Sequence, residues 1–139
     1  MPTPAKHRSA CPLNAALEVY GDRWTLLIVR DLMFKDKAGY SEFLASEEGI
    51  STNILADRLR ALEAEGIVAG QRDPANRRKV VYHLTAKGID LAPVLTELII
   101  WGARHAETDA PPEVIREMEE NREDFLRKVR ARLEAVAKD

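Results

Sequence analysis

The chain has a single cysteine, Cys11, so it can form neither an internal disulfide nor a cysteine-rich metal site. Its histidines, His7, His83 and His105, are far apart and match no metal-ligand spacing. It has no glycine-rich phosphate loop, no GxSxG or HExxH motif, and no nucleophile paired with a base. These absences predict that the protein is not an enzyme and holds no metal or other cofactor.

Long hydrophobic runs are also missing. No stretch approaches the roughly 18 apolar residues that a membrane span needs, which excludes a membrane partner. The first ten residues, MPTPAKHRSA, have no apolar core and do not resemble a signal peptide. They predict a flexible arm over residues 1–10. With 45% hydrophobic and 32% charged residues, the chain can bury a core, and we expect a cytoplasmic protein.

The sequence lacks the excess of basic residues that usually marks a nucleic-acid-binding protein, because its formal net charge is −2. The distribution of charge matters more than its sum. Residues 72–79 combine Arg72, Arg77, Arg78 and Lys79 with Asp73, a local charge of +3. Such a cluster can bind phosphates through counterion release, and the alternative is a basic loop that only aids solubility.

Helical periodicity dominates the first half of the chain. Pro12 suits a first helical position, and Gly21 ends that helix. Asp22 is a good N-cap for a second helix, which carries an apolar stripe as far as the FKDKAG run. A short third helix from about Tyr40 to Leu44 precedes Glu47-Glu48-Gly49, where glycine can adopt a positive φ in a turn.

The fourth predicted helix, from Thr52 to about Glu65, divides into two faces. Ser51 can cap it, and Leu55, Leu59 and Leu62 cluster on one side. The other side is polar and consists of Thr52, Asn53, Ala56, Asp57, Arg60 and Glu63. One face therefore belongs to a core and the other is available, either to a ligand or only to water.

Two β-compatible runs follow, over residues 67–72 and 79–84, joined by the turn formers of Asp73–Arg78. Two short helices, a tight turn and a basic hairpin make a winged helix-turn-helix. The predicted fold class is mainly α with a small β-hairpin, with flanking helices that support dimerisation. One further helix is expected to run from Thr85 through Trp101, and a C-terminal amphipathic helix over residues 112–138, about Glu113 to Ala137.

The polar face of the fourth helix is the predicted base-reading surface. Asn53 can pair bidentately with adenine, Arg60 can reach guanine or a phosphate, and Asp57 can accept only from a cytosine amino group. Tyr40 and Ser41 can bind phosphate, although Tyr40 suits a core equally well. The full set of predicted DNA-binding residues is Tyr40, Ser41, Ser51, Thr52, Asn53, Ala56, Asp57, Arg60, Arg72, Asn76, Arg77, Arg78 and Lys79.

Cys11 admits two interpretations. It lies at a helix N-terminus, where the helix dipole stabilises a thiolate, so it is a candidate redox sensor. A free cysteine is also commonly a small packing residue.

Four motifs in order resemble the HxlR-type family of bacterial winged helix regulators, relatives of the MarR group. They are CPLNAALEVYGDRWTLLIVRDL, GISTNILADRLRALEAEGIV, RRKVVYHLTAKG and the LxPVLxxLxxWG pattern of residues 91–102, within a domain over residues 11–106. The resemblance implies a recognition helix at residues 51–65, a wing at 72–79, and a homodimer formed by the first helix and those after the wing. The dimer residues it suggests are Leu13, Leu17, Leu91, Val94, Leu95, Leu98 and Trp101. Some members of the family sense electrophiles or oxidants with a cysteine matching Cys11.

The sequence therefore predicts a dimeric, sequence-specific DNA-binding transcriptional regulator that binds a double-stranded operator. We expect a repressor, because occluding a promoter requires no further contact with polymerase. Its signal is either thiol oxidation or a small-molecule effector. The alternative is a winged helix module that binds protein without specific DNA binding, which the neutral overall charge and Asp57 favour.

Overall fold

The computed structural model describes residues 7–138. Along them the order of elements is α1 (Pro12–Tyr20), α2 (Thr25–Phe34), α3 (Tyr40–Leu44), α4 (Thr52–Ala64), β1 (Val68–Asp73), β2 (Asn76–Leu84), α5 (Ala86–Ile89), α6 (Ala92–His105), α7 (Pro112–Glu120) and α8 (Arg122–Lys138). Helices with one antiparallel hairpin confirm the predicted fold class. None of the helices among the described residues is long and apolar enough to cross a bilayer.

The core surrounds α2, which is apolar on most of its surface. The N-cap of α2 is Trp24 and not the predicted Asp22, which lies two residues earlier. The Oδ1 of Asp22 still holds the start of the helix, because it accepts the N–H groups of Trp24 and Thr25 at 2.8 and 3.0 Å. Ile28, Val29 and Met33 are 2% exposed or less. Buried leucines of α4, the hairpin and the C-terminal helix α8 pack around them, so one core joins both halves of the chain.

The helix-turn-helix forms where the sequence predicted it. Gly49 has φ +73°, the left-handed conformation that glycine adopts cheaply. The Ser51 side chain accepts the N–H of Ile54 at 3.2 Å and so caps α4. Leu55, Leu59 and Leu62 are all buried, which leaves the opposite face of α4 to solvent.

The wing is longer than its predicted strands. Val68 pairs with Leu84 and Arg72 with Val80, and the register shifts after Arg72. Asp73 then pairs with Asn76 across a tight turn, so β2 begins three residues before the predicted position. The hairpin docks on the body where the N–H of Tyr82 donates to the carbonyl of Ala38 at 2.8 Å.

The helix expected from Thr85 through Trp101 is instead two helices, α5 and α6. Thr85 does cap the first of them, since its side chain accepts the N–H of Gly88. Pro93 explains the break, because it lacks an N–H and its ring would clash with the carbonyl four residues earlier. Proline is tolerated in the first turn of α6, so a new helix begins there.

The single C-terminal helix that was expected is also two, α7 and α8, separated at Asn121 with φ −123° and ψ 43°. The two segments pack against different surfaces. Helix α7 contacts α6, whereas α8 contacts α5, α6 and β2. One straight helix could not reach both surfaces, and the turn at Asn121 allows it.

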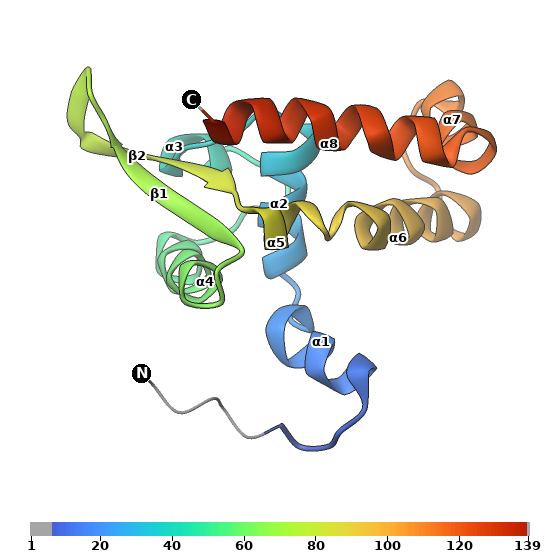
Figure 1. The fold of residues 1–139 in the computed structure, drawn as a ribbon, viewed down its shortest axis with the longest axis horizontal. Helices are drawn as coiled ribbons and strands as arrows, with labels where there is room; N and C mark the ends of the chain where they lie inside the picture. Colours follow the sequence, from blue (N-terminus) through green and yellow to red (C-terminus); the bar gives the residue numbers. More distant parts are fainter. Residues whose placement is uncertain (1–6, 139) are drawn as a thin grey trace.

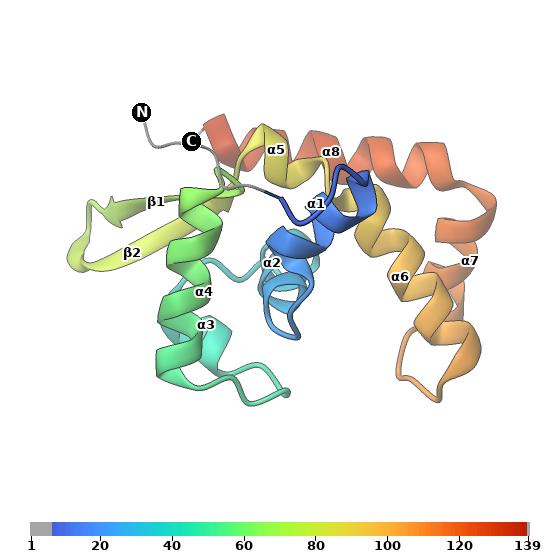
Figure 2. The same ribbon diagram turned by 90° about the horizontal axis from the view of Figure 1, so that it is seen from below.

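The elements form an elongated molecule (Figure 1). The hairpin, α3 and α4 lie at one end, α6 and α7 extend toward the other, and α8 runs across the top of both. Helix α1 projects from the body below α2. The view from below shows α1 and α2 between α4 and α6 (Figure 2). The predicted reading helix and wing therefore share one end of the molecule.

Candidate nucleic-acid interface

The solvent face of α4 carries the predicted base-reading residues. Thr52, Asn53, Asp57 and Arg60 are exposed and Ala56 is half-buried. Ser51 is exposed as well, but its hydroxyl is used by the cap. The face offers an amide, a carboxylate, a hydroxyl and a guanidinium, which are groups that can distinguish base edges in a major groove.

An arginine that is shared by two carboxylates, which the sequence did not suggest, holds Asp57 in place. Arg58 forms ion pairs with Asp57 at 3.0 Å and with Asp22 at 3.4 Å, and so ties α4 to the turn that precedes α2. Burial acts to raise the pKa of Asp22, but hydrogen bonds from Thr25 and Trp24 and the charge of Arg58 outweigh it and lower that pKa. Arg58 thus offsets the negative charge of Asp57 on the solvent face of α4.

The short helix α3 braces the reading helix. The Tyr40 hydroxyl donates to the carbonyl of Thr52 at 3.4 Å, across the turn that joins the two helices. Tyr40 is 36% exposed, so it lies at the rim of the core, and Ser41 beside it is exposed. Tyr40, which the sequence left open as a core or a phosphate-binding residue, thus contacts the first residue of α4.

The wing tip is held by its own polar side chains. Arg72 donates from Nη1 to the carbonyl of Arg77 at 2.7 Å. The Asn76 Oδ1 accepts the N–H of Arg78 at 3.2 Å, and the Asp73 Oδ1 accepts that of Ala75 at 2.9 Å. Arg72 and Asn76 therefore stabilise the conformation of the hairpin tip through hydrogen bonds to its backbone.

The remaining wing cations are free to bind. Arg77, Arg78 and Lys79 are exposed, and no ion pair of the described residues includes them. The Lys79 side chain extends toward α3, since a Cβ added to Gly39 would lie 3.2 Å from its Cε. A tip of this kind presents positive charge without an internal partner to neutralise it.

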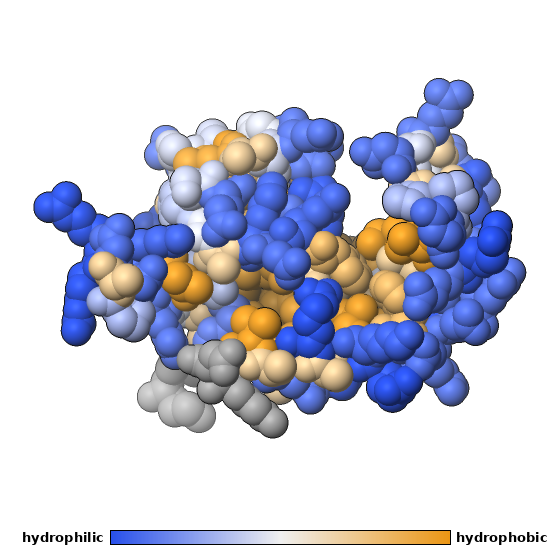
Figure 3. Space-filling view, turned by 90° about the horizontal axis from the view of Figure 1, so that it is seen from above, coloured by the Kyte–Doolittle hydropathy of each residue, from blue (hydrophilic) through white to orange (hydrophobic). Residues whose placement is uncertain are grey.

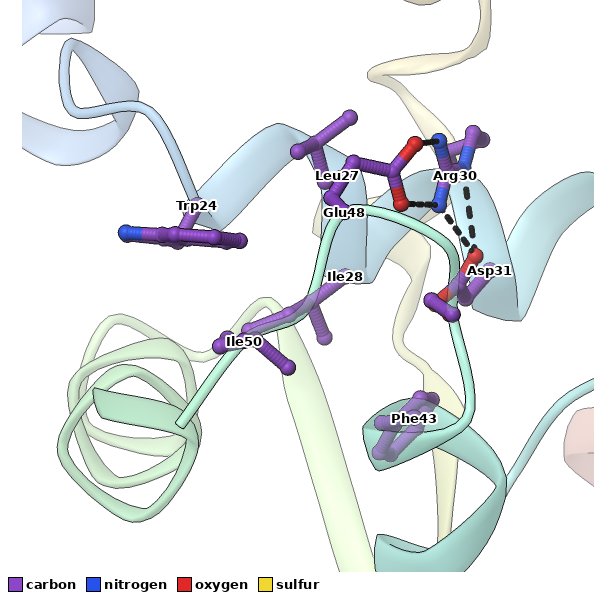
Figure 4. A pocket seen from close by; sticks show the side chains of 9 residues that line it. Trp24, Leu27, Ile28, Arg30, Asp31, Phe43, Glu48 and Ile50 are labelled. Atoms are coloured by element: carbon purple, nitrogen blue, oxygen red, sulfur yellow. Dashed lines mark hydrogen bonds and ion pairs between the residues drawn. The ribbon is translucent and has the colours of Figure 1, made fainter. Parts of the chain in front are cut away.

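A partly buried charge network supports the turn before α4 (Figure 4). Arg30 of α2 donates to both carboxylate oxygens of Glu48 at 2.7 and 2.9 Å, and also to Asp31. Ser46 donates to Asp31 at 2.6 Å, and Lys37 donates to Ser46 at 2.7 Å. The network ties α2 to the residues that connect α3 with α4.

The ion pair between Arg30 and Glu48 stabilises the charged form of each side chain. The hydrogen bond from Arg30 lowers the pKa of Glu48 to about 2, and the one to Glu48 raises the pKa of Arg30. In the sequence, Arg30 and Asp31 interrupt the apolar pattern of α2, but the partners Ser46 and Glu48 become apparent only in the structure, where Asp31 is 3% exposed. A charged pair within such a pattern indicates a buried polar contact.

Residues that were expected at a dimer interface divide into exposed and buried groups. Leu13, Leu17, Leu98 and Trp101 are between 51% and 66% exposed, an unusual exposure for such large apolar side chains. Leu91 and Val94 are half-buried. Leu95 is 3% exposed and belongs to the core of its own subunit, so it offers no surface to a partner in this conformation.

Cys11 is a free, exposed thiol in the N-cap position of α1, and its N–H donates to the Ser9 hydroxyl at 3.3 Å. Of the predicted arm, residues 1–6 lie outside the described residues. His7 contacts Glu18, and the Arg8 N–H donates to Glu18 at 3.0 Å. Within residues 7–138 no group of His, Cys, Asp and Glu side chains is placed to hold a metal ion.

Comparison with known proteins identifies the family. Residues 19–110 match the sequence profile of the family described as HxlR-like helix-turn-helix. The chain belongs to the HxlR-like helix-turn-helix family. Its members include transcriptional regulators that bind DNA, so this chain is an HxlR-type transcriptional regulator.

Several bacterial relatives are similar over most of their length. The regulator YodB of Bacillus subtilis is 37% identical over 98 residues, which cover 70% of this chain and 87% of YodB. YvaP, an uncharacterised HTH-type regulator of the same organism, is 36% identical over 92 residues, 66% of this chain and 84% of YvaP.

Solved structures give the same result. PA1607, a putative transcription factor, is 35% identical with a TM-score of 0.66, covering 75% of this chain and 71% of its own. The reduced form of YodB is 35% identical with a TM-score of 0.57 and covers 71% of this chain and 97% of its own. These HxlR-type neighbours confirm the winged helix assignment. Helices α7 and α8 lie beyond the 19–110 segment that the family profile matches, as does Cys11.

Proposed function

We propose that this HxlR-type regulator is a homodimer that binds a specific operator, with α4 in the major groove and the wing on the adjacent backbone. The observation that carries the proposal is the pairing of an exposed polar face on α4 with unpaired basic side chains at the wing tip, at one end of the molecule. A regulatory role also agrees with the names of its relatives. We propose a regulatory rather than a catalytic protein on that basis.

Each side chain has a distinct proposed role. Asn53 is suited to an adenine edge and Arg60 to a guanine edge or a phosphate. Asp57, held by Arg58, accepts from a cytosine amino group. Arg77 and Arg78 bind phosphates or enter a narrow minor groove, which concentrates negative potential.

The proposed dimer uses the exposed apolar residues of α1 and α6. A two-fold axis would place two α4 helices about 34 Å apart, one turn of DNA, and would match a pseudo-palindromic operator. Binding at such a site represses by covering the promoter, which needs no contact with polymerase.

Fluorescence anisotropy tests the proposal, with DNA from the protein's own upstream region titrated at several salt concentrations against scrambled competitor. The wild type should resist the competitor and weaken with salt. Replacing Arg77 and Arg78 by alanine should flatten the slope of log affinity against log salt by about 2 for each subunit that contacts DNA. Replacing Arg127 and Lys128 on α8 removes the same charge at an exposed site and should leave the slope unchanged.

A winged helix that binds protein instead of DNA is the second candidate, favoured by the net charge of −2. The same titration separates the two. If the wing variant and the α8 variant give equal slopes, or if the wild type does not distinguish operator from competitor at low salt, the DNA-binding proposal fails.

Thiol oxidation at Cys11 is the proposed signal. Among the relatives, structures exist of YodB in reduced, diamide-treated and quinone-bound forms, and of the redox regulator HypR in its oxidised form. Because Cys11 is the sole cysteine, oxidation by diamide would join two subunits through one S–S bond and pass two electrons and two protons to the diamide. Diamide should weaken DNA binding in the wild type and not in Cys11→Ser. An equal effect in the two proteins would contradict a sensing role for Cys11.

A further inference from the structure

We propose that the cleft between α2, α6 and the C-terminal helices binds a small apolar acid, an aromatic carboxylate in chemical class, and that its occupancy changes DNA affinity. The second half of this statement depends on the DNA-binding function proposed above. The first half does not, because it concerns only a cavity and its walls.

The cleft has the size of a ligand site. Its volume is about 600 Å³, within the range of roughly 300–1,000 Å³ typical of small-molecule pockets. It is open beside Gly102 of α6, where an added Cβ would meet no atom within 4 Å. The view from above shows a hollow with apolar side chains on its floor, between the two ends of the molecule (Figure 3).

The walls favour an aromatic body. Phe34 of α2 and Phe125 of α8 stack with their ring centroids 6.3 Å apart and 23° between the planes, and both line the cleft. Ile99, Val114 and Met118 complete the apolar lining. Flat rings can pack against such a surface with favourable offset or edge contacts.

The mouth of the cleft favours an acid. Arg30 and Lys35 of α2 lie there with Asp109 as the acidic neighbour. The Arg30 guanidinium is already occupied by Glu48 and Asp31, whereas Lys35 is exposed and no ion pair of the described residues includes it. The first turn of α7, also at the cleft, has no capping side chain, but Glu113 already places a carboxylate at its positive end, so the preference for an acid rests on Lys35.

Arg30 connects the cleft with the reading helix. It lies in the wall of the cleft and clamps Glu48, three residues before the cap of α4. A ligand that shifts α2 therefore acts on the turn that positions α4. Coupling of this kind is reciprocal, so DNA should change the affinity for the ligand by the same factor.

The C-terminal extension of the chain supplies one wall of this site. Val114, Met118 and Phe125 come from α7 and α8, which follow the segment that matches the family profile. The cleft is consequently a feature of this chain that the family assignment does not supply.

Isothermal titration calorimetry of the full-length protein with naphthoate tests the proposal. We expect saturable binding to the wild type and a loss of at least about tenfold in affinity for Gly102→Leu, whose side chain would fill the open space. Ala135→Leu adds a leucine on an exposed part of α8 that does not line the cleft and should bind as the wild type does.

A second substitution tests the charge and does not depend on packing. Lys35→Gln should weaken naphthoate binding by about threefold and leave the neutral naphthalenemethanol unchanged, because an exposed ion pair contributes little. Absence of naphthoate binding to the wild type, or equal binding to Gly102→Leu, overturns the proposal.

Anisotropy with operator DNA, measured on the same proteins, keeps the two proposals separate. Naphthoate binding without DNA binding contradicts the proposed function and leaves the site intact. DNA binding that naphthoate alters in the wild type and not in Gly102→Leu supports the coupling, and unaltered DNA binding at saturating naphthoate contradicts it.

Discussion

Single residues determine how the turn before α4 is held. Asp31 is 3% exposed, and a buried carboxylate is costly unless it is paired and hydrogen-bonded. Arg30 and Ser46 supply those partners at 2.8 and 2.6 Å. Because Arg30 also binds Glu48, one guanidinium both neutralises the buried Asp31 and anchors the turn before α4.

Arg30→Gln tests this interpretation. It should lower the free energy of unfolding by about 3 kcal/mol, because removing one partner leaves Asp31 buried without its counter-charge. Arg104→Gln is the control, since the Arg104–Glu119 pair is largely exposed and should contribute no more than about 1 kcal/mol. Urea denaturation measures both, and equal losses would show that Arg30 acts as an ordinary surface charge.

Glu48 predicts a pH dependence of stability. Its pKa is about 2 in the folded protein, below its ordinary value of 4.5, because the Arg30 guanidinium donates to it. A lowered folded-state pKa stabilises the protein fully above the unfolded pKa, and this contribution is lost as pH falls from about 4.5 to about 2. The unfolding free energy should therefore fall between pH 6 and pH 3 by about 1–2 kcal/mol more in the wild type than in Glu48→Gln, as measured by urea denaturation at the two pH values. The same fall in both proteins would contradict the assignment.

Among the elements, α5 makes a close contact with the residue that precedes β1. A Cβ added to Gly88 would lie 2.2 Å from the backbone carbonyl oxygen of Ile67, so only glycine fits there. The Thr85 hydroxyl donates to the carbonyl of Gly66 at 2.5 Å beside it. The wing is thereby fixed to the helix that leads into α6.

Gly88→Ala should cost about 2–3 kcal/mol or more of unfolding free energy, because backbone atoms must move to admit the methyl group. Gly102→Ala is the matched control in another helix. There the added methyl meets open space, and alanine should stabilise the helix by up to about 1 kcal/mol. Thermal unfolding followed by circular dichroism compares them, and a harmless Gly88→Ala would show that α5 does not press on the hairpin.

At the scale of the whole molecule, α1 and α6 expose several large apolar side chains to solvent. Leu17 is 51% exposed, Leu98 is 52% and Trp101 is 66%. An exposed apolar set of this kind marks an interaction surface. A second copy of the chain fits the regulator proposed here, because a dimer presents two reading helices.

Leu98→Glu should convert the proposed dimer into a folded monomer at low micromolar concentration. A carboxylate buried without a partner at an interface costs several kcal/mol, whereas the exposed position costs the subunit little. Light scattering after size-exclusion chromatography measures the mass. Val136→Glu, at a 55% exposed position on α8, is the control and should leave the mass unchanged. A Leu98→Glu protein that remains dimeric would place the interface elsewhere.

Local signals explain why much of the fold was predictable. Gly49, Ser51 and Thr85 act through their own backbone and nearest turns, so their roles follow from sequence neighbours. The break at Pro93 follows the same local chemistry, but the apolar pattern across it concealed two helices. The turn at Asn121 depends on which surfaces α7 and α8 meet, and no local rule contains that information.

The amino-acid sequence by itself determined the winged helix-turn-helix, the polar face of α4 and the basic wing tip. Periodicity, caps and turn residues act over a few positions, and those features need nothing more. The tertiary structure alone decided the Arg30 network, the burial of Leu95, the close contact at Gly88 and the cleft beneath the C-terminal helices. These depend on groups that are distant in the chain and meet only when the core closes around α2.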